Sequence, residues 1–268
     1  MNEFLFQYNN KEFTANDLHD AFKEAGIGTG DKLFIHSDLR SFGRVNPNIS
    51  QEEYLGAFVE VLTDLVGENG VVIMPTFSYS FGRGEIYDPQ NTPSTVGSLT
   101  EYFRKLPNVV RTIDPILSVA IWGDNKGSYV NVGTDCFGEG SIFQKIYNED
   151  FKIMFLGETF DMTYLHFVEQ SFKVPYRYIK KFTGQIKAEY ELKEYTFDYY
   201  ARDLDQDPRC DLEKIASSMS GVLRSVRLGF SQIRVVSAKD AYSTIFRMLE
   251  KDKFALLTEE SKKELIKH

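Results

Sequence analysis

The residues of this chain best suited to do chemistry are a histidine and a glutamate three positions apart, His166 and Glu169. A strand is predicted over residues 152–157 and then a helix, with Asp161 or Thr163 available as its N-cap. Positions i and i+3 of a helix lie on one face, so the carboxylate can contact the imidazole. That contact fixes the tautomer of the ring and raises its basicity, as a general base near neutral pH requires. Such pairs also occur as surface decoration, but the position just past a strand end favours catalysis.

A second polar segment, residues 36–43 (His-Ser-Asp-Leu-Arg-Ser-Phe-Gly), follows a strand predicted over 32–36. Ligands usually bind at the carboxyl ends of strands in open sheets. His36 is either a ligand contact or a strand-end side chain bonded to backbone, and the sequence leaves both open. The glycine-rich turn before this strand ends a helix predicted over 11–27, because a dinucleotide fingerprint would follow the strand instead.

The next segments continue the alternation of helix and strand. Ser50 and Glu53 form a capping box before a helix, and residues 70–75 are a wholly apolar strand. Thr92 is a candidate N-cap with Pro93 at the first helical position. Free amides at that helix start could bind an anion, although a well-capped helix accounts for the pattern equally. Two strands within 109–123 and a helix over 141–147 follow.

The pattern changes after residue 172. Residues 174–184 and 185–200 alternate polar with apolar or aromatic side chains, which is typical of half-solvated antiparallel strands. A helix over 211–216, a strand over 229–236 and a helix over 238–249 complete the chain. We therefore predict an α/β protein, with a layered α/β/α core, a mixed sheet, and a C-terminal antiparallel β and helical extension.

Composition excludes several classes of protein. The chain has 268 residues and a net charge of −8, which argues against a general nucleic-acid binder. No apolar run reaches the length of a membrane span and no signal peptide is recognisable, so a cytoplasmic location is expected. Cys136 and Cys210 match neither a disulfide framework nor a zinc-ligand spacing.

Six blocks, in order along the chain, carry a resemblance to one family. They are 36–43, 74–78, 87–89 with 92–94 and Gly97, 111–112 with Pro115 and Ser118, 140–143, and 156–157 with Thr163 and 166–169. Together these blocks resemble the aminoglycoside 3-N-acetyltransferase family, whose fold is distinct from that of the GNAT acetyltransferases. Each block alone is weak evidence, but their order and spacing cover most of the chain.

The resemblance implies transfer of an acyl group from acetyl-CoA to a primary amine on a sugar. In that reaction His166 would be the general base, Glu169 would orient it, and Thr76 or Ser118 would place a hydroxyl near the thioester carbonyl. A sugar amine is largely protonated at neutral pH, and a base contributes typically ~10²–10⁴-fold to its attack. One donor to the developing oxyanion contributes ~10²–10³-fold.

The resemblance also implies which residues bind the coenzyme and the substrate. The coenzyme contacts would be His36, Ser37, Arg40, Ser41, Phe42, Gly43, Thr92, Pro93 and Ser94. The substrate contacts would be Asp88, Ser78, Asp114 and Tyr176, although an Asp-Pro turn explains Asp88 equally well. Residues 1–172 are expected to form the acyl-CoA-binding and catalytic core and 173–268 an antiparallel β/helical subdomain packed on it. No metal is expected, since His36, His166 and Glu169 could form a metal site only if the fold brought them together.

Two departures from the family pattern bear on the substrate. Resistance enzymes of the family typically carry His-Pro where this chain has Asp114-Pro115. The block 166–178 looks more like relatives from surface-polysaccharide and sugar-nucleotide pathways. The sequence therefore predicts a nucleotide-linked deoxyamino sugar as acceptor, with an aminoglycoside as the alternative. Arg177, Lys180 and Lys181 are either phosphate contacts or a solvated charge run.

Direct transfer is favoured over the other mechanisms and functions open to this sequence. A covalent acyl-enzyme on Cys136 is disfavoured because Asp135 and Glu139 discourage a thiolate, and no Gly-x-Ser-x-Gly elbow occurs. A non-catalytic sugar-binding relative is the alternative from another class, and a metal hydrolase using His36 and His166 is a remote third. A small-molecule acceptor and a monomer or homodimer are expected, with no nucleic-acid or membrane partner.

Overall fold

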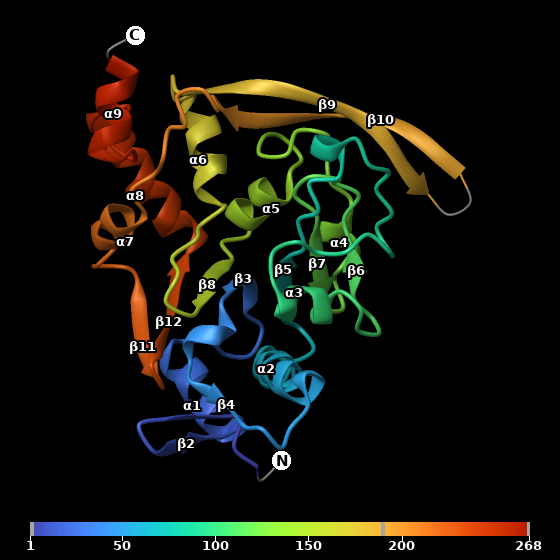
Figure 1. Cartoon of the computed structure of the whole chain (residues 1–268), viewed down its shortest axis with the longest axis vertical. Coiled ribbons are helices and arrows are strands. Elements are labelled where there is room, and N and C mark those ends of the chain that lie inside the picture. The colour runs from blue at the N-terminus through green and yellow to red at the C-terminus, as the bar shows by residue number, and fades with distance from the viewer. Residues whose placement is uncertain (1–2, 189–190, 267–268) are drawn as a thin grey trace.

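A seven-stranded mixed sheet forms the centre of the computed structural model, which describes residues 3–188 and 191–266 (Figure 1). The strand order is β11-β12-β8-β3-β5-β7-β6. The strands are β3 (Lys32–Ser37), β5 (Val71–Pro75), β6 (Val110–Arg111), β7 (Val119–Trp122), β8 (Lys152–Leu156), β11 (Arg224–Leu228) and β12 (Ser231–Ser237). β3 is parallel to both of its neighbours, β5 and β8, and the remaining pairs are antiparallel. The predicted mixed α/β fold is confirmed.

Helices cover both faces of this sheet. One face packs against α1 (Ala15–Glu24), α2 (Gln51–Val66) and α3 (Ser98–Phe103). The other packs against α4 (Gly127–Val130), α5 (Ile142–Asn148), α6 (Leu165–Phe172), α7 (Leu212–Ser218) and α8 (Ala238–Lys251), with α9 (Glu259–Ile266) at its edge. Successive side chains of a strand point to opposite faces, so Phe34 and Ile35 of β3 belong to different hydrophobic clusters. A sheet buried on both faces explains why the central strands are continuously apolar.

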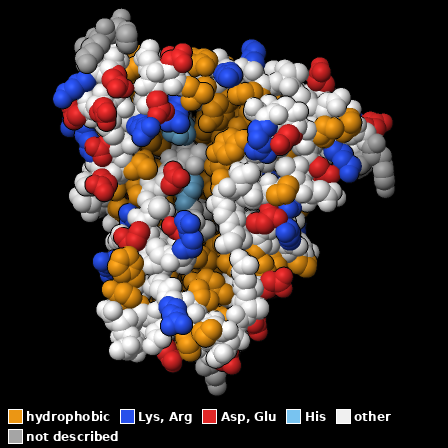
Figure 2. Space-filling model, in the orientation of Figure 1, with side chains coloured by type: hydrophobic (Ala, Val, Ile, Leu, Met, Phe, Trp, Pro, Cys, Tyr) orange, Lys and Arg blue, Asp and Glu red, His pale blue; other side chains and the backbone are white. Residues whose placement is uncertain are grey.

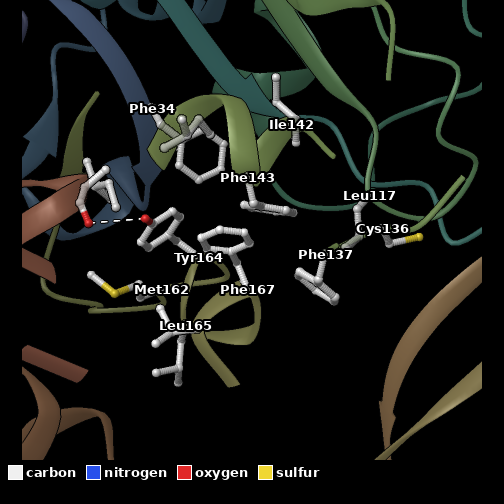
Figure 3. Close-up of a cluster of buried hydrophobic side chains, with 14 of the residues drawn as sticks. Phe34, Leu117, Cys136, Phe137, Ile142, Phe143, Met162, Tyr164, Leu165 and Phe167 are labelled. Carbon is white, nitrogen blue, oxygen red and sulfur yellow. Dashed lines mark hydrogen bonds between the residues drawn. The ribbon is translucent and has the colours of Figure 1, made fainter. Parts of the chain in front are cut away.

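The cluster on the α6 face fixes the element that carries His166. Figure 3 shows Tyr164 and Phe167 directed toward Phe34 of β3 and Phe143 of α5. Tyr164 and Phe34 are fully buried, and the Tyr164 hydroxyl donates a hydrogen bond of 3.2 Å to the backbone carbonyl of Ala238. The start of α6 is therefore held by packing against the sheet.

Two smaller sheets lie outside the core. β1 (Phe6–Tyr8), β2 (Lys11–Phe13) and β4 (Arg44–Val45) form a short sheet near the N-terminus, and 3₁₀ turns occupy Leu39–Ser41 and Phe81–Arg83. β9 (Arg177–Ala188) and β10 (Glu191–Arg202) form a long antiparallel hairpin that crosses the top of the molecule in Figure 1. The antiparallel strands predicted after residue 172 are therefore present, although the first continues through Gly184.

The division predicted at residue 172 remains a prediction. β11 and β12 come from the segment assigned to the second subdomain, and β12 pairs with β8 inside the central sheet. The two parts of the chain thus share one sheet. Among the described residues, no helix has the length and apolar character needed to cross a membrane.

The N-termini of the helices agree only in part with the caps predicted from the sequence. The capping box of Ser50 with Glu53 is present, and Thr14 forms another at the start of α1. The helix predicted to begin at Pro93 is wrong, because α3 begins at Ser98 after an irregular segment. The caps predicted for the His166 helix are also wrong: Tyr164 occupies the N-cap without a side-chain hydrogen bond.

Candidate active site

The candidate site lies where two parallel neighbouring strands end. In the register of β3 and β8, His36 pairs with Phe155 and Ser37 with Leu156. In the sheet, β5 is the neighbour of β3 on one side and β8 is its neighbour on the other. The chain passes from β3 to β5, so the loops after β3 and β8 diverge. Such a topological switch point opens a crevice for ligands. Gly157 sits at this junction with φ +124°, and a Cβ there would lie 2.6 Å from the carbonyl oxygen of Asp38.

Three adjoining cavities surround this junction. A groove of about 1320 Å³ runs between the loops after β3 and β8, an inner cavity of about 210 Å³ contains His36, and a hairpin cavity of about 390 Å³ lies under β9 and β10. Asp161 lines all three, and His166 lines the inner and hairpin cavities. Figure 2 shows histidine atoms in a hollow on this face. His166 therefore lies where the inner and hairpin cavities meet, and Asp161 joins both to the groove.

The His166 ring is held by a carboxylate and an aromatic side chain. Its Nδ1 lies 2.6 Å from Oε2 of Glu169, and its ring makes an edge contact with Phe137 at 5.5 Å between centroids. Since an ionised carboxylate only accepts hydrogen bonds, Nδ1 carries the proton and the basic lone pair is on Nε2. The His166 side chain is 24% exposed, so it remains accessible from the cavities.

Glu169 is the centre of a buried polar cluster. Its side chain is fully buried and receives a hydrogen bond of 2.9 Å from the Tyr176 hydroxyl. Arg177 Nε lies 2.6 Å from the Glu169 carboxylate, and the Cys210 thiol lies 3.6 Å from it. Burial alone would raise the pKa of Glu169, but His166, Arg177 and Tyr176 outweigh it and lower that pKa. Glu169 is therefore ionised at neutral pH.

The electrostatics of the cluster keep His166 neutral. Burial lowers the pKa of His166, the positive charge of Arg177 lowers it further, and Glu169 opposes both. The net pKa lies below the ordinary value of 6.5. A neutral imidazole with a free Nε2 is the form that can accept a proton.

His36 lies in an apolar environment beside this site. Its ring stacks on Phe155 at 5.6 Å and contacts the edge of Phe34 at 4.9 Å. Burial lowers the pKa of His36 to about 3, so the ring is uncharged. Its Nε2 is buried without a hydrogen-bond partner in the described part of the chain. Within residues 3–188 and 191–266, no group of three His, Cys, Asp or Glu side chains is arranged to hold a metal ion.

The hydroxyls predicted to serve the thioester carbonyl are engaged inside the protein. Thr76 donates to the carbonyl oxygen of Ser118 at 3.2 Å, and Ser118 donates to that of Thr76 at 2.8 Å. Ser78, predicted to contact substrate, donates to the carbonyl oxygen of Pro115 at 2.9 Å. All three side chains are fully buried and line none of the three cavities. Their predicted roles are untested, and the geometry favours a structural role.

Arg111 joins this hydroxyl cluster to the loop before α3. It is 8% exposed, and its guanidinium donates to the Thr76 hydroxyl at 3.0 Å and to the carbonyl oxygens of Thr76 and Thr92. Burial lowers its pKa, but the group remains a cation. Hydrogen bonds to uncharged oxygen atoms therefore stabilise this buried cation.

We expect Arg111→Met to lower the free energy of unfolding by about 2–4 kcal/mol, because several charge-assisted hydrogen bonds disappear and buried carbonyls lose their donors. Urea denaturation followed by circular dichroism measures this change. Lys105→Met, at a side chain that is 61% exposed, is the control and should change stability by less than about 0.5 kcal/mol. Equal effects of the two substitutions would contradict the assignment.

The predicted coenzyme residues divide into two groups. Ser37 and Arg40 line the groove, and Ser37 also reaches the inner cavity. Ser41 is 3.0 Å from the Ser231 hydroxyl, and Phe42 is fully buried. Gly43 has φ +157°, and a Cβ there would lie 2.5 Å from the Gln7 carbonyl oxygen. Ser41, Phe42 and Gly43 therefore pack the loop after β3 against the rest of the protein.

The remaining predicted contacts lie away from His166 or support it indirectly. Thr92, Pro93 and Ser94 precede the groove-lining segment 95–99. Asp88 pairs with Lys187 at 3.0 Å beside a separate small cavity. Asp114 is buried and accepts backbone hydrogen bonds at 2.8 Å from Ile116 and Leu117, as an Asp-Pro turn allows. Tyr176 contacts Glu169 and lines none of the three cavities, so its predicted contact with substrate stays a prediction.

Sequence reasoning missed two groove or cavity residues. The sequence indicates Asp161 only as a helix cap, yet this residue lines all three cavities. Arg234 of β12 lines the groove, donates to the Glu158 carbonyl oxygen at 2.6 Å, and keeps a buried Nε without a partner in the described residues. Its position in a predicted strand carried no functional signal, because only the pairing of β12 with β8 brings it to the site.

Comparison with known proteins decides the family. A family model described as aminoglycoside 3-N-acetyltransferase matches residues 34–250. The chain belongs to this family. The predicted family and enzyme class, a coenzyme-A-dependent N-acyltransferase, are thereby confirmed.

Individual relatives agree with this assignment. The chain is 28% identical over 191 residues to the SPbeta prophage-derived aminoglycoside N(3')-acetyltransferase-like protein YokD of Bacillus subtilis (strain 168), an alignment covering 62% of this chain and 67% of that protein. It is 29% identical over 170 residues to the aminoglycoside N(3)-acetyltransferase IV of Salmonella sp, covering 62% of each, so it spans less than two thirds of that relative.

Solved structures share the fold at low sequence identity. The aminoglycoside acetyltransferase AAC(3)-Xa superposes with a TM-score of 0.76 at 21% identity, over 88% of this chain and 92% of that one. AAC-IIIb in a binary complex with CoASH gives 0.75 at 20% identity, over 89% and 96%. AAC-VIa bound to sisomicin gives 0.76 at 20% identity, over 90% and 98%.

Proposed function

We propose that this enzyme transfers the acetyl group of acetyl-CoA to a primary amine of an amino sugar, with His166 as general base and no covalent intermediate. The observation that carries the proposal is the His166–Glu169 pair, at 2.6 Å, where the inner and hairpin cavities meet. The family assignment supports the reaction class, and the CoASH complex of the relative AAC-IIIb supports the co-substrate.

The groove is the place for the coenzyme. Coenzyme A is a nucleotide joined to a long pantetheine arm, and the groove of about 1320 Å³ is the largest of the three cavities. Hydroxyls of Ser37, Thr95 and Ser98 can bind amide and phosphate groups, and Arg234 supplies positive charge, whereas Arg40 pairs with Asp38 at 2.9 Å. The groove meets the inner cavity at Ser37 and Thr159, which gives the thioester a route toward His166.

The reaction follows from the protonation states at the site. Neutral Nε2 of His166 removes a proton from the attacking amine while the nitrogen forms a bond to the thioester carbonyl carbon. The C–S bond then breaks, and the proton held by His166 passes to the departing coenzyme thiolate. Glu169 keeps the tautomer fixed and stabilises the imidazolium that forms between these steps.

Both thiols are poorly suited to a covalent route. Burial raises the pKa of Cys136, and Asp114 raises it further. Burial also raises the pKa of Cys210, and the nearby Glu169 carboxylate adds to that effect. Because the thiolate is the nucleophile, protonated thiols at neutral pH support direct attack by the amine.

The comparisons favour an aminoglycoside-type amino sugar over the nucleotide-linked sugar predicted from the sequence. The relatives are named for aminoglycosides, and AAC-VIa is bound to sisomicin. Nucleotide-linked acceptors stay a candidate because of the charges around the hairpin cavity.

A thiol-release assay tests the proposal. We expect acetyl-CoA with sisomicin or a UDP-linked amino sugar to release free coenzyme thiol, with one N-acetyl product detected by mass spectrometry for each thiol. Reactions without amine are the control for hydrolysis of the thioester. The proposal fails if no amine in such a panel is acetylated and calorimetry also detects no binding of coenzyme A.

A further inference from the structure

The hairpin cavity carries a distinctive charge pattern. Along antiparallel strands, alternate residues face one side, and the hairpin residues of that side that line the cavity are Tyr178, Lys180, Phe182, Tyr199 and Ala201. Lys181, the next residue along the chain, lies outside the cavity lining and pairs with Asp198 at 2.8 Å. Lys180 thus faces the cavity, whereas its neighbour is already neutralised outside it.

Basic side chains outnumber acids in the cavity lining. Arg177, Lys180, Arg202 and Arg209 line it, and among the described residues Asp161 is the one carboxylate that does. Arg177 is neutralised by Glu169. Arg202 and Arg209 lie 2.7 Å and 2.8 Å from the same carboxylate, that of Asp207, so one positive charge remains there.

Lys180 adds a second positive charge, and among the described residues no carboxylate pairs with it; once Asp161 is subtracted, the cavity lining carries a net charge of +1. Its Nζ lies 5.0 Å from the centroid of the Phe182 ring, a contact that leaves its full charge available to a ligand. The chain as a whole carries −8, so a positive cavity is a local feature that the total does not predict. Such a cavity attracts anions.

Building on the proposed function, we propose that the acceptor is an amino sugar carrying a phosphate group. Its amine lies at His166, and its phosphate lies at Lys180, with Arg202 and Arg209 as further cations of the cavity lining. His166 and Lys180 line the same cavity of about 390 Å³, so one sugar phosphate can extend from one to the other. Tyr178, Phe182 and Tyr199 provide apolar walls for the sugar ring.

The coenzyme is the other source of phosphate that could use these cations. It is disfavoured because the groove is the larger cavity and meets the inner cavity, which His166 lines, at Ser37 and Thr159. If coenzyme phosphate occupied the hairpin cavity, the acceptor amine would have to reach His166 through the groove. The two arrangements predict different effects of the same substitution.

Two acceptors with the same amine provide the kinetic test: glucosamine and glucosamine 1-phosphate. We expect kcat/KM to be at least about tenfold higher for the phosphate in the wild-type enzyme and this preference to fall toward unity in Lys180→Met, with an unchanged KM for acetyl-CoA. Lys181→Met, one residue along the strand and outside the cavity, should leave the preference intact. A preference for glucosamine, or a raised KM for acetyl-CoA in Lys180→Met with the preference unchanged, would overturn the proposal.

A binding measurement separates this proposal from the reaction itself. Calorimetric titration of UDP into enzyme saturated with coenzyme A should show binding. The affinity should fall about tenfold in Lys180→Met and stay unchanged in Lys181→Met. In the wild-type enzyme it should also fall as the salt concentration rises. Binding that disappears when coenzyme A is present would assign the cations to the coenzyme and defeat the proposal. Absence of UDP binding at any coenzyme concentration would defeat it as well, whatever the outcome of the acetylation assay.

Discussion

Replacing His166 with asparagine should lower kcat by about 10²–10⁴-fold, the usual contribution of a general base. The asparagine amide can take the place of Nδ1–H and keep the contact with Glu169, while nothing replaces the lone pair of Nε2. The groove is not altered, so KM for acetyl-CoA should stay within about threefold. Steady-state kinetics with the best amine measure both, and an unchanged melting temperature is the control. A fall in kcat of less than tenfold would remove His166 from the role of base.

The pH dependence of kcat is a second test of the role of His166. The neutral form of His166 is the active one, and burial together with Arg177 lowers its pKa below 6.5. Activity should therefore persist as pH falls through 6.5 and be lost only below it. In His166→Asn this acid limb should be absent from kcat, which separates it from the ionisation of free substrate.

Local signals made much of the fold predictable. Ser50 and Glu53 satisfy each other within one helical turn, and the β5 strand is apolar because both its faces are covered. The His166–Glu169 contact is also local, since the helix alone sets the separation of i and i+3. These features depend on few residues that are close in sequence.

The remainder of the site depends on contacts distant in sequence. Cys210 lies 41 positions from the glutamate it contacts, and Arg234 reaches the groove only because β12 pairs with β8. The sequence could not predict whether the hydroxyls of Thr76 and Ser118 face a cavity. A serine or threonine hydroxyl donates to a backbone carbonyl oxygen as readily as to a substrate. The irregular segment before α3 likewise follows from Arg111, which binds the Thr92 carbonyl oxygen.

Glu169→Gln should lower kcat by about 10²–10⁴-fold and also destabilise the protein. A glutamine amide can donate to Nδ1 as well as accept from it, so His166 can adopt the tautomer whose lone pair faces away from the amine. Loss of the carboxylate also leaves Arg177, whose side chain is 5% exposed, without its counter-ion. Breaking a buried pair in this way costs about 3–5 kcal/mol, which urea denaturation would measure.

A double variant, Glu169→Gln with Arg177→Met, distinguishes the two effects. Removing the buried cation should restore much of the lost stability, because no unpaired charge then remains in the cluster. It should not restore kcat, because the tautomer of His166 is still uncontrolled. Full recovery of kcat in the double variant would mean that Glu169 serves only to neutralise Arg177. Recovery of stability alone would show that the carboxylate acts on the reaction through the imidazole.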